Sequence, residues 1–73
     1  MPHINIKHFP SLTQEQHIAL ATSITEVITK VVGCDESVVS IAVEPVTPEE
    51  WDKKVYIPEI VDKKDTLIKT PDY

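Results

Sequence analysis

Residues 13–33 read TQEQHIALATSITEVITKVVG, and this stretch decides the fold because it predicts one long amphipathic helix. Thr13, followed at the third position by Gln16, forms a capping-box pattern that starts the helix at about Gln14. Gly33 ends it after Val32, because a residue without Cβ adopts the left-handed C-cap conformation at little cost. Apolar residues recur along one face of the helix: Leu20, Ile24, Val27, Ile28 and Val31.

A β-strand is predicted on each side of this helix. His3–Phe9 reads HINIKHF, which alternates apolar and polar residues, and Val38–Val43 reads VVSIAV, a nearly continuous β-prone run. A helix between two strands is a βαβ crossover, in which the strands lie parallel and the connection is right-handed. Two strands and one helix cannot close a core, so we expect another copy of the subunit to complete the sheet.

Further helical structure is predicted after the second strand. Thr47 and Pro48 form a helix start, which predicts a short helix carrying Trp51. Pro58 predicts the start of another helix in the C-terminal tail. The predicted fold class is therefore α+β: a single domain of residues 1–73 with a β-α-β subunit, parallel strands, a sheet completed by oligomerisation and an extra C-terminal helix.

Length and composition limit what the chain can be. A chain of 73 residues buries only about 60% of the surface that it exposes when unfolded, which favours self-association. The single cysteine excludes an intrachain disulfide and suits a reducing compartment. The opening MPHINIKHFP resembles neither a signal peptide nor a membrane span, so we expect a soluble, cytoplasmic protein.

Charge and motif content argue against several classes of ligand. The formal net charge of −5 disfavours nucleic acid and acidic membranes as partners. The single glycine cannot make a phosphate-binding loop, and no cofactor motif is present. We also expect no metal site, because the candidate ligands lack chelating spacing: His3, His8, His17 and Cys34.

Pro2 is the residue most informative about chemistry. Cytosolic processing removes an initiator methionine before a small residue, which leaves the proline nitrogen as a free secondary amine. An α-amino group has a pKa of about 7.7–8.0 in water, and desolvation lowers that value, so this nitrogen could act as a general base near neutral pH. In an arbitrary protein, a proline at this position affects only processing and stability, so its significance depends on the rest of the sequence.

Segments spread along the whole chain are similar to those of a known protein family. The opening PHINIK, the central SVVSIAVEPVTPEEW and the closing LIKTPDY resemble the 4-oxalocrotonate tautomerase family, and within it the dimeric PptA-type branch. That resemblance implies a homodimer rather than a hexamer. It also implies that Pro2 is the catalytic acid and base, taking a proton from an enol hydroxyl and returning it to carbon.

The resemblance also suggests substrate-binding positions. The two arginines that bind substrate carboxylates in the hexameric members fall at Leu12 and Ser40, so the chain has no arginine clamp and dicarboxylate substrates are disfavoured. The aromatic residue of the family pocket falls at Trp51, although a lone tryptophan is as often part of a core or an interface. The implied substrate is a small 2-keto or enol acid, a monocarboxylate or aromatic enol such as phenylenolpyruvate.

A non-enzymatic function stays open at this point. The same scaffold without its arginines could serve as an oligomeric interaction module, because fold does not fix function. If the chain is an enzyme, we expect weak or narrow activity, since one positioned base contributes about 10²- to 10⁴-fold in rate and little else would stabilise an enolate.

Overall fold

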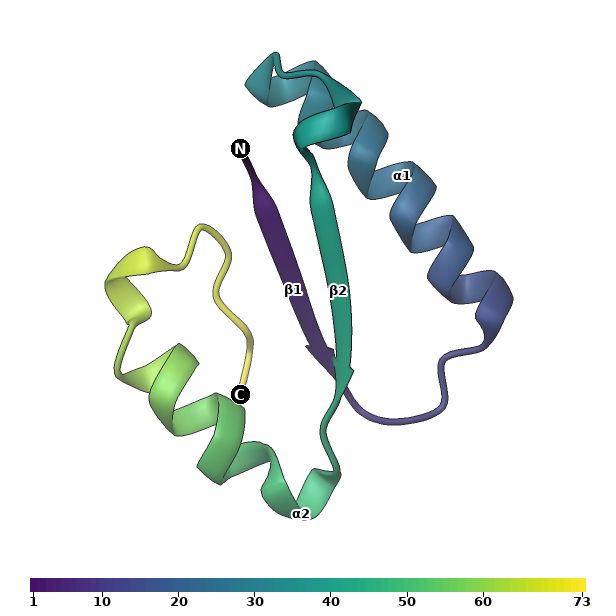
Figure 1. Ribbon diagram of the computed structural model, residues 1–73. Helices are drawn as coiled ribbons and strands as arrows, with labels where there is room; N and C mark the ends of the chain where they lie inside the picture. Colours follow the sequence, from purple (N-terminus) through teal and green to yellow (C-terminus); the bar gives the residue numbers. More distant parts are fainter.

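The computed structural model describes residues 1–73 and contains a β-α-β unit followed by a C-terminal helical segment (Figure 1). The elements, in chain order, are β1 (His3–His8), α1 (Gln14–Val32), the 3₁₀ turn η1 (Glu36–Val38), β2 (Ser40–Pro45), α2 (Pro48–Trp51), the π-helix η2 (Asp52–Val61) and the 3₁₀ turn η3 (Lys64–Thr66). The helix α1 and the α2–η2 segment lie on opposite sides of the strands (Figure 1). No helix is long and apolar enough to cross a membrane.

The strands confirm the predicted crossover. β1 and β2 are hydrogen-bonded in parallel, with His3 opposite Ser40 and His8 opposite Pro45. The second strand begins later than predicted, because Val38 ends the turn η1, in which the Asp35 side chain accepts a hydrogen bond from the Ser37 backbone N–H at 2.9 Å. A side chain that caps the turn in this way competes with the extended conformation.

The helix α1 has the predicted bounds and caps. The Thr13 side chain accepts from the Gln16 backbone at 3.1 Å, and the Gln16 side chain accepts from the Thr13 backbone at 2.8 Å, which completes the capping box. Gly33 has a φ of 81°, and its N–H donates to the Thr29 carbonyl at 3.0 Å. Local sequence therefore fixes both ends of this helix.

The C-terminal segment corrects one prediction. Pro58 does not start a helix but lies inside η2, which continues directly from α2. A proline inside a helix removes its own N–H and crowds the preceding turn, yet the π-helix carries on past Pro58, with the Asp62 N–H donating to the Ile57 carbonyl at 3.0 Å. After the single turn η3, residues 67–73 form neither helix nor strand, although a helix was predicted for this tail.

The interior of one chain is small. Only Val46, the residue after β2, and Val55 of η2 are buried, at 3% and 6% exposure. The accessible surface of 5864 Å² exceeds the ~4,500 Å² typical of a folded monomer of this mass. The radius of gyration, 13.7 Å, likewise exceeds the ~11 Å of a compact chain of this length. The single subunit therefore leaves apolar surface without a partner.

Candidate functional site

Pro2 and Ser40 meet at the amino-terminal end of the sheet. The Ser40 N–H donates to the Pro2 carbonyl at 3.2 Å, and the Ser40 hydroxyl shares a hydrogen bond with His3 Nδ1 at 2.7 Å. Pro2 is half-buried, whereas Met1 is 99% exposed. The sheet thus holds the Pro2 backbone in place while leaving Met1 accessible for removal. While Met1 is attached, the Pro2 nitrogen is an amide without a basic lone pair.

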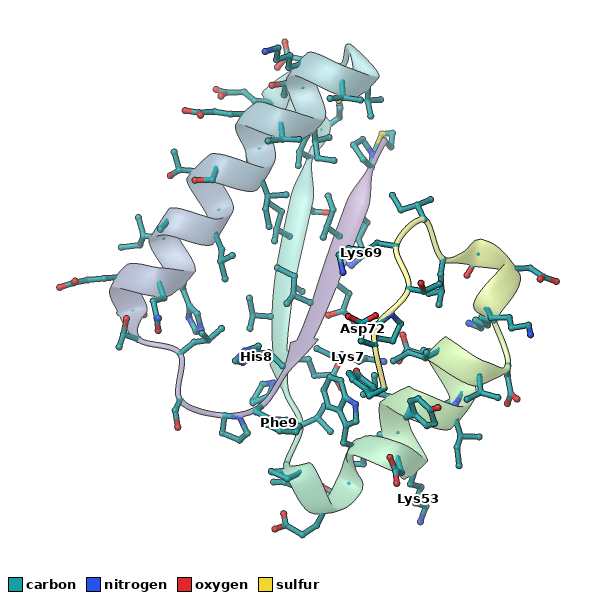
Figure 2. All side chains as sticks on the ribbon, turned by 180° about the vertical axis from the view of Figure 1, so that it is seen from behind. Lys7, His8, Phe9, Lys53, Lys69 and Asp72 are labelled. Carbon is teal, nitrogen blue, oxygen red and sulfur yellow. The ribbon has the colours of Figure 1, made fainter.

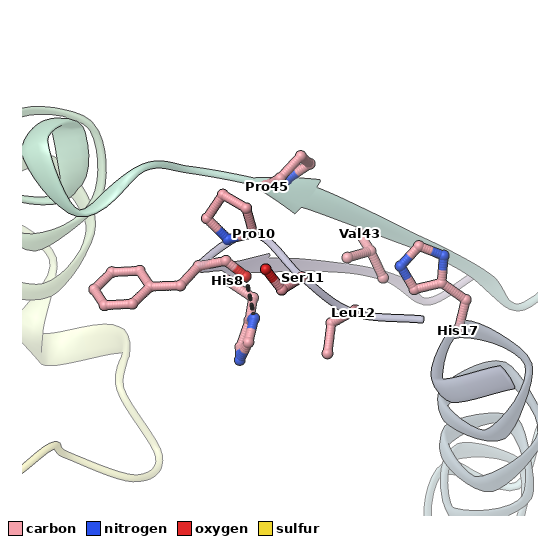
Figure 3. Close-up of a pocket in the computed structure, with 8 residues that line it drawn as sticks. His8, Pro10, Ser11, Leu12, His17, Val43 and Pro45 are labelled. Carbon is pink, nitrogen blue, oxygen red and sulfur yellow. Dashed lines mark hydrogen bonds between the residues drawn. The ribbon is translucent and has the colours of Figure 1, made fainter. Parts of the chain in front are cut away.

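Leu12 lies at the opposite, carboxyl-terminal end of the strands. There it lines a cavity of about 260 Å³ between the strand ends and the start of α1 (Figure 3). The other lining residues are His8, Phe9, Pro10, Ser11, His17, Val43 and Pro45. Parallel strands commonly place ligands at this edge, so the cavity is a candidate ligand pocket.

Trp51 lines a second cavity beside the first. This cavity measures about 450 Å³ and is lined by His8, Phe9, Trp51 and Tyr73. The rings of Phe9 and Trp51 meet edge to face, with centroids 5.2 Å apart and planes at 88°. Because His8 and Phe9 line both cavities, the two form neighbouring compartments of one apolar region.

His8 supplies a polar group to both compartments. Its Nδ1 lies 2.5 Å from the Phe9 carbonyl oxygen (Figure 3). A carbonyl can only accept, so Nδ1 donates the hydrogen in this contact. The neighbouring Ser11 has a φ of 99°, a left-handed conformation that is costly outside glycine and that shapes the turn closing the first compartment.

Lys7 and His8 lie on opposite sides of β1, as strand alternation predicts (Figure 2). Lys7 forms an ion pair with Glu59 of η2, whereas His8 faces the cavities. The hydrogen bond to Glu59 is the main cause of a raised Lys7 pKa. Lys7 is therefore engaged in joining β1 to η2, away from both compartments.

A single chain does not unite the residues assigned to the site. Pro2 and Ser40 lie at one end of the sheet, and Leu12 and Trp51 lie at the other. The six residues of β1 between these ends span roughly 20 Å at ~3.3 Å per residue. None of the cavities in the chain is lined by Pro2.

The sequence did not single out Tyr73 or Phe9 as site residues. Both line the larger cavity with Trp51, and Tyr73 also packs against Tyr56, with ring centroids 5.7 Å apart. Only composition could have pointed to these two residues: aromatic residues make up just 5% of the chain, and one of them lies at its end. No group of three or more His, Cys, Asp or Glu residues is placed to hold a metal ion.

Comparison with known proteins identifies the family. A family model described as "Tautomerase enzyme" matches residues 2–52. Proteins named tautomerase PptA from Cronobacter sakazakii and Klebsiella pneumoniae are 45% and 46% identical over all of this chain and 97% of theirs. A crystal structure of DmpI from Helicobacter pylori matches with a TM-score of 0.60 and 26% identity, over 63% of this chain and 73% of that one.

The fold and these matches define a small β-α-β isomerase. The chain belongs to the tautomerase family. This confirms the resemblance and the fold class derived from the sequence, and it favours an enzyme over a non-enzymatic interaction module.

Proposed function

We propose that this protein converts a small enol acid to its keto form with the Pro2 amine as acid and base. Once Met1 is removed, the nitrogen lone pair takes the enol hydroxyl proton as the carbonyl forms. The electron pair of the carbon–carbon double bond then takes the proton back from the prolyl ammonium. The observation that carries this proposal is the placement of Pro2 at the start of β1, held by Ser40 beneath an exposed Met1.

The active site is proposed to form between two subunits of a homodimer. Pro2 lies about a strand length from the Leu12 and Trp51 cavities of its own chain, so one pocket containing all three requires a second copy. The unpartnered apolar surface supports such an assembly. We place this dimer in the cytoplasm, where removal of the initiator methionine frees Pro2.

The proposed substrate is an aromatic enol acid with one carboxylate, such as phenylenolpyruvate. The chain contains seven basic residues, all of them lysines, so a bidentate guanidinium clamp for a second carboxylate is absent. Leu12 and Trp51 make the pocket walls apolar, and an apolar wall beside the Pro2 nitrogen favours its uncharged form. Ser40 remains as a small polar group beside Pro2.

Ketonisation of phenylenolpyruvate tests the proposal. Protein whose intact mass shows that Met1 is absent should accelerate the reaction, and Pro2→Ala should lower kcat by about 10²- to 10⁴-fold, the usual contribution of one positioned base. Protein that retains Met1 should also be slow, because its Pro2 nitrogen is an amide. Equal rates for wild type and Pro2→Ala would remove Pro2 from the mechanism.

The charge state of Pro2 provides an independent test. NMR titration of the nitrogen should give a pKa below the ~7.7–8.0 of a free α-amino group, because an apolar site disfavours the ammonium form. The matched control is Pro2 in urea-unfolded protein. A pKa equal to or above that of the unfolded chain contradicts an apolar pocket around this atom.

A further inference from the structure

The larger cavity gathers most of the aromatic side chains of the protein. The sequence contains one Phe, one Trp and two Tyr, and three of these four line this space: Phe9, Trp51 and Tyr73. They come from the residue after β1, the end of α2 and the last residue of the chain. The tail therefore brings a ring to the cavity from a distant part of the sequence.

The tail is positioned by contacts other than those of the cavity. Tyr73 packs against Tyr56 of η2 at 5.7 Å between ring centroids, and Pro71 is half-buried. The tail turns back after η3, so that the C-terminus lies next to the helical segment (Figure 1). Asp72, next to Tyr73, lies on the same side of β1 as Lys7 (Figure 2). Tyr73, itself 66% exposed, thus joins Phe9 and Trp51 in lining the cavity.

We propose that Tyr73, with Phe9 and Trp51, binds the aromatic ring of the substrate and makes the enzyme selective for planar rings. A volume of about 450 Å³ accommodates a phenyl group and its acid chain and lies in the size range of small-molecule sites. Ring walls favour another ring, because aromatic pairs gain energy beyond that of the buried area. The imidazole of His8 also lines this cavity.

This inference rests on the proposed function for its substrate class, but a non-reactive probe tests it separately. Trp51 is the only tryptophan, so its fluorescence reports directly on the cavity. We expect 3-phenylpropanoate to change Trp51 emission saturably and to bind several-fold more tightly than 3-cyclohexylpropanoate, which has the same acid chain and a non-planar ring.

Variants of the tail isolate the role of the ring. Tyr73→Ala should weaken 3-phenylpropanoate binding roughly 2- to 10-fold, the equivalent of one aromatic contact, and remove the preference over the cyclohexyl probe. Tyr73→Phe should bind normally because it keeps the ring. Ile68→Ala is the matched control, because Ile68 lies in the same tail, is fully exposed and lines no cavity.

Three results would overturn the inference. Equal affinity for the planar and the saturated ring would show that the cavity does not select aromatic groups. Unchanged binding in folded Tyr73→Ala, checked by thermal unfolding, would exclude the tail from the pocket. Trp51 emission that responds to protein concentration but not to the probe would show that the second subunit fills the cavity. None of these results bears on the proposed role of Pro2, which the ketonisation assay tests separately.

Discussion

At the residue scale, the Lys7–Glu59 ion pair gives a prediction with a defined pH dependence. Hydrogen bonding to Glu59 raises the pKa of Lys7 above its ordinary value of 10.5. A raised folded-state pKa means that the stabilising contribution is complete below 10.5 and is lost as the pH rises through the higher folded value. Lys7→Met should therefore lower the melting temperature at pH 7, and the difference from wild type should vanish in strong alkali.

Thermal unfolding followed by circular dichroism measures this effect. Lys54→Met is the matched control, because Lys54 pairs with Glu50 one turn away and its side chain is 54% exposed. Exposed pairs within one helix contribute little, so the control should change the melting temperature less than Lys7→Met does. A Lys7→Met difference that persists unchanged in strong alkali would contradict a role for the charge.

Gly33 gives a second prediction at the same scale. Its φ of 81° lies in the left-handed region, while the space around its missing Cβ is open. Gly33→Ala should therefore lower the free energy of unfolding by roughly 1–2 kcal/mol through backbone conformation alone. Gly33→Asn should cost less, because asparagine tolerates this conformation. Urea denaturation measures both changes, and equal losses for Ala and Asn would exclude the backbone explanation.

At the scale of elements, the N-cap of α1 sets how firmly the crossover helix begins. Thr13→Ala removes the hydroxyl that accepts the Gln16 N–H, which should cost about 1 kcal/mol in urea denaturation. Thr13→Ser keeps the hydroxyl and should stay close to wild type. If the alanine and serine variants are equally stable, the capping box contributes nothing measurable.

Elements fixed by neighbouring residues were predictable from the sequence, and elements fixed by distant contacts were not. The bounds of α1 follow from Thr13 and Gly33, which act within a turn of the helix. The π-helix η2 continues through Pro58, whereas local rules place a helix start at that proline. The tail was predicted to continue as a helix and is irregular instead, so the position of Tyr73 near Trp51 could not be read from the residues.

The candidate site, too, was predictable only in part from the sequence. The resemblance to a family singled out Pro2, Ser40, Leu12 and Trp51 by alignment. The parallel register then determined that Ser40 contacts Pro2, while Leu12 and Trp51 lie a strand length away. Alignment alone did not reveal this separation, which is why the pocket is proposed to form between subunits.

At the scale of the whole molecule, α1 presents more apolar surface than its own chain covers. Leu20, Ile24 and Ile28 are half-buried, but Val27 and Val31 of the same stripe are 58% and 77% exposed. Burial of apolar area is the main favourable term in protein association. We therefore expect the outer half of the stripe to lie in the subunit interface.

Val31→Glu should then convert the protein from a dimer, at twice the 8.2 kDa of the chain, to a monomer in sedimentation equilibrium. A buried carboxylate without a partner is costly enough to separate the subunits. Thr22→Glu is the matched control, because it adds the same charge to an exposed position outside the stripe. Since Pro2 and Trp51 are proposed to meet only across subunits, Val31→Glu should lose ketonisation in step with dissociation. A fully active monomer would instead place the whole site within one chain.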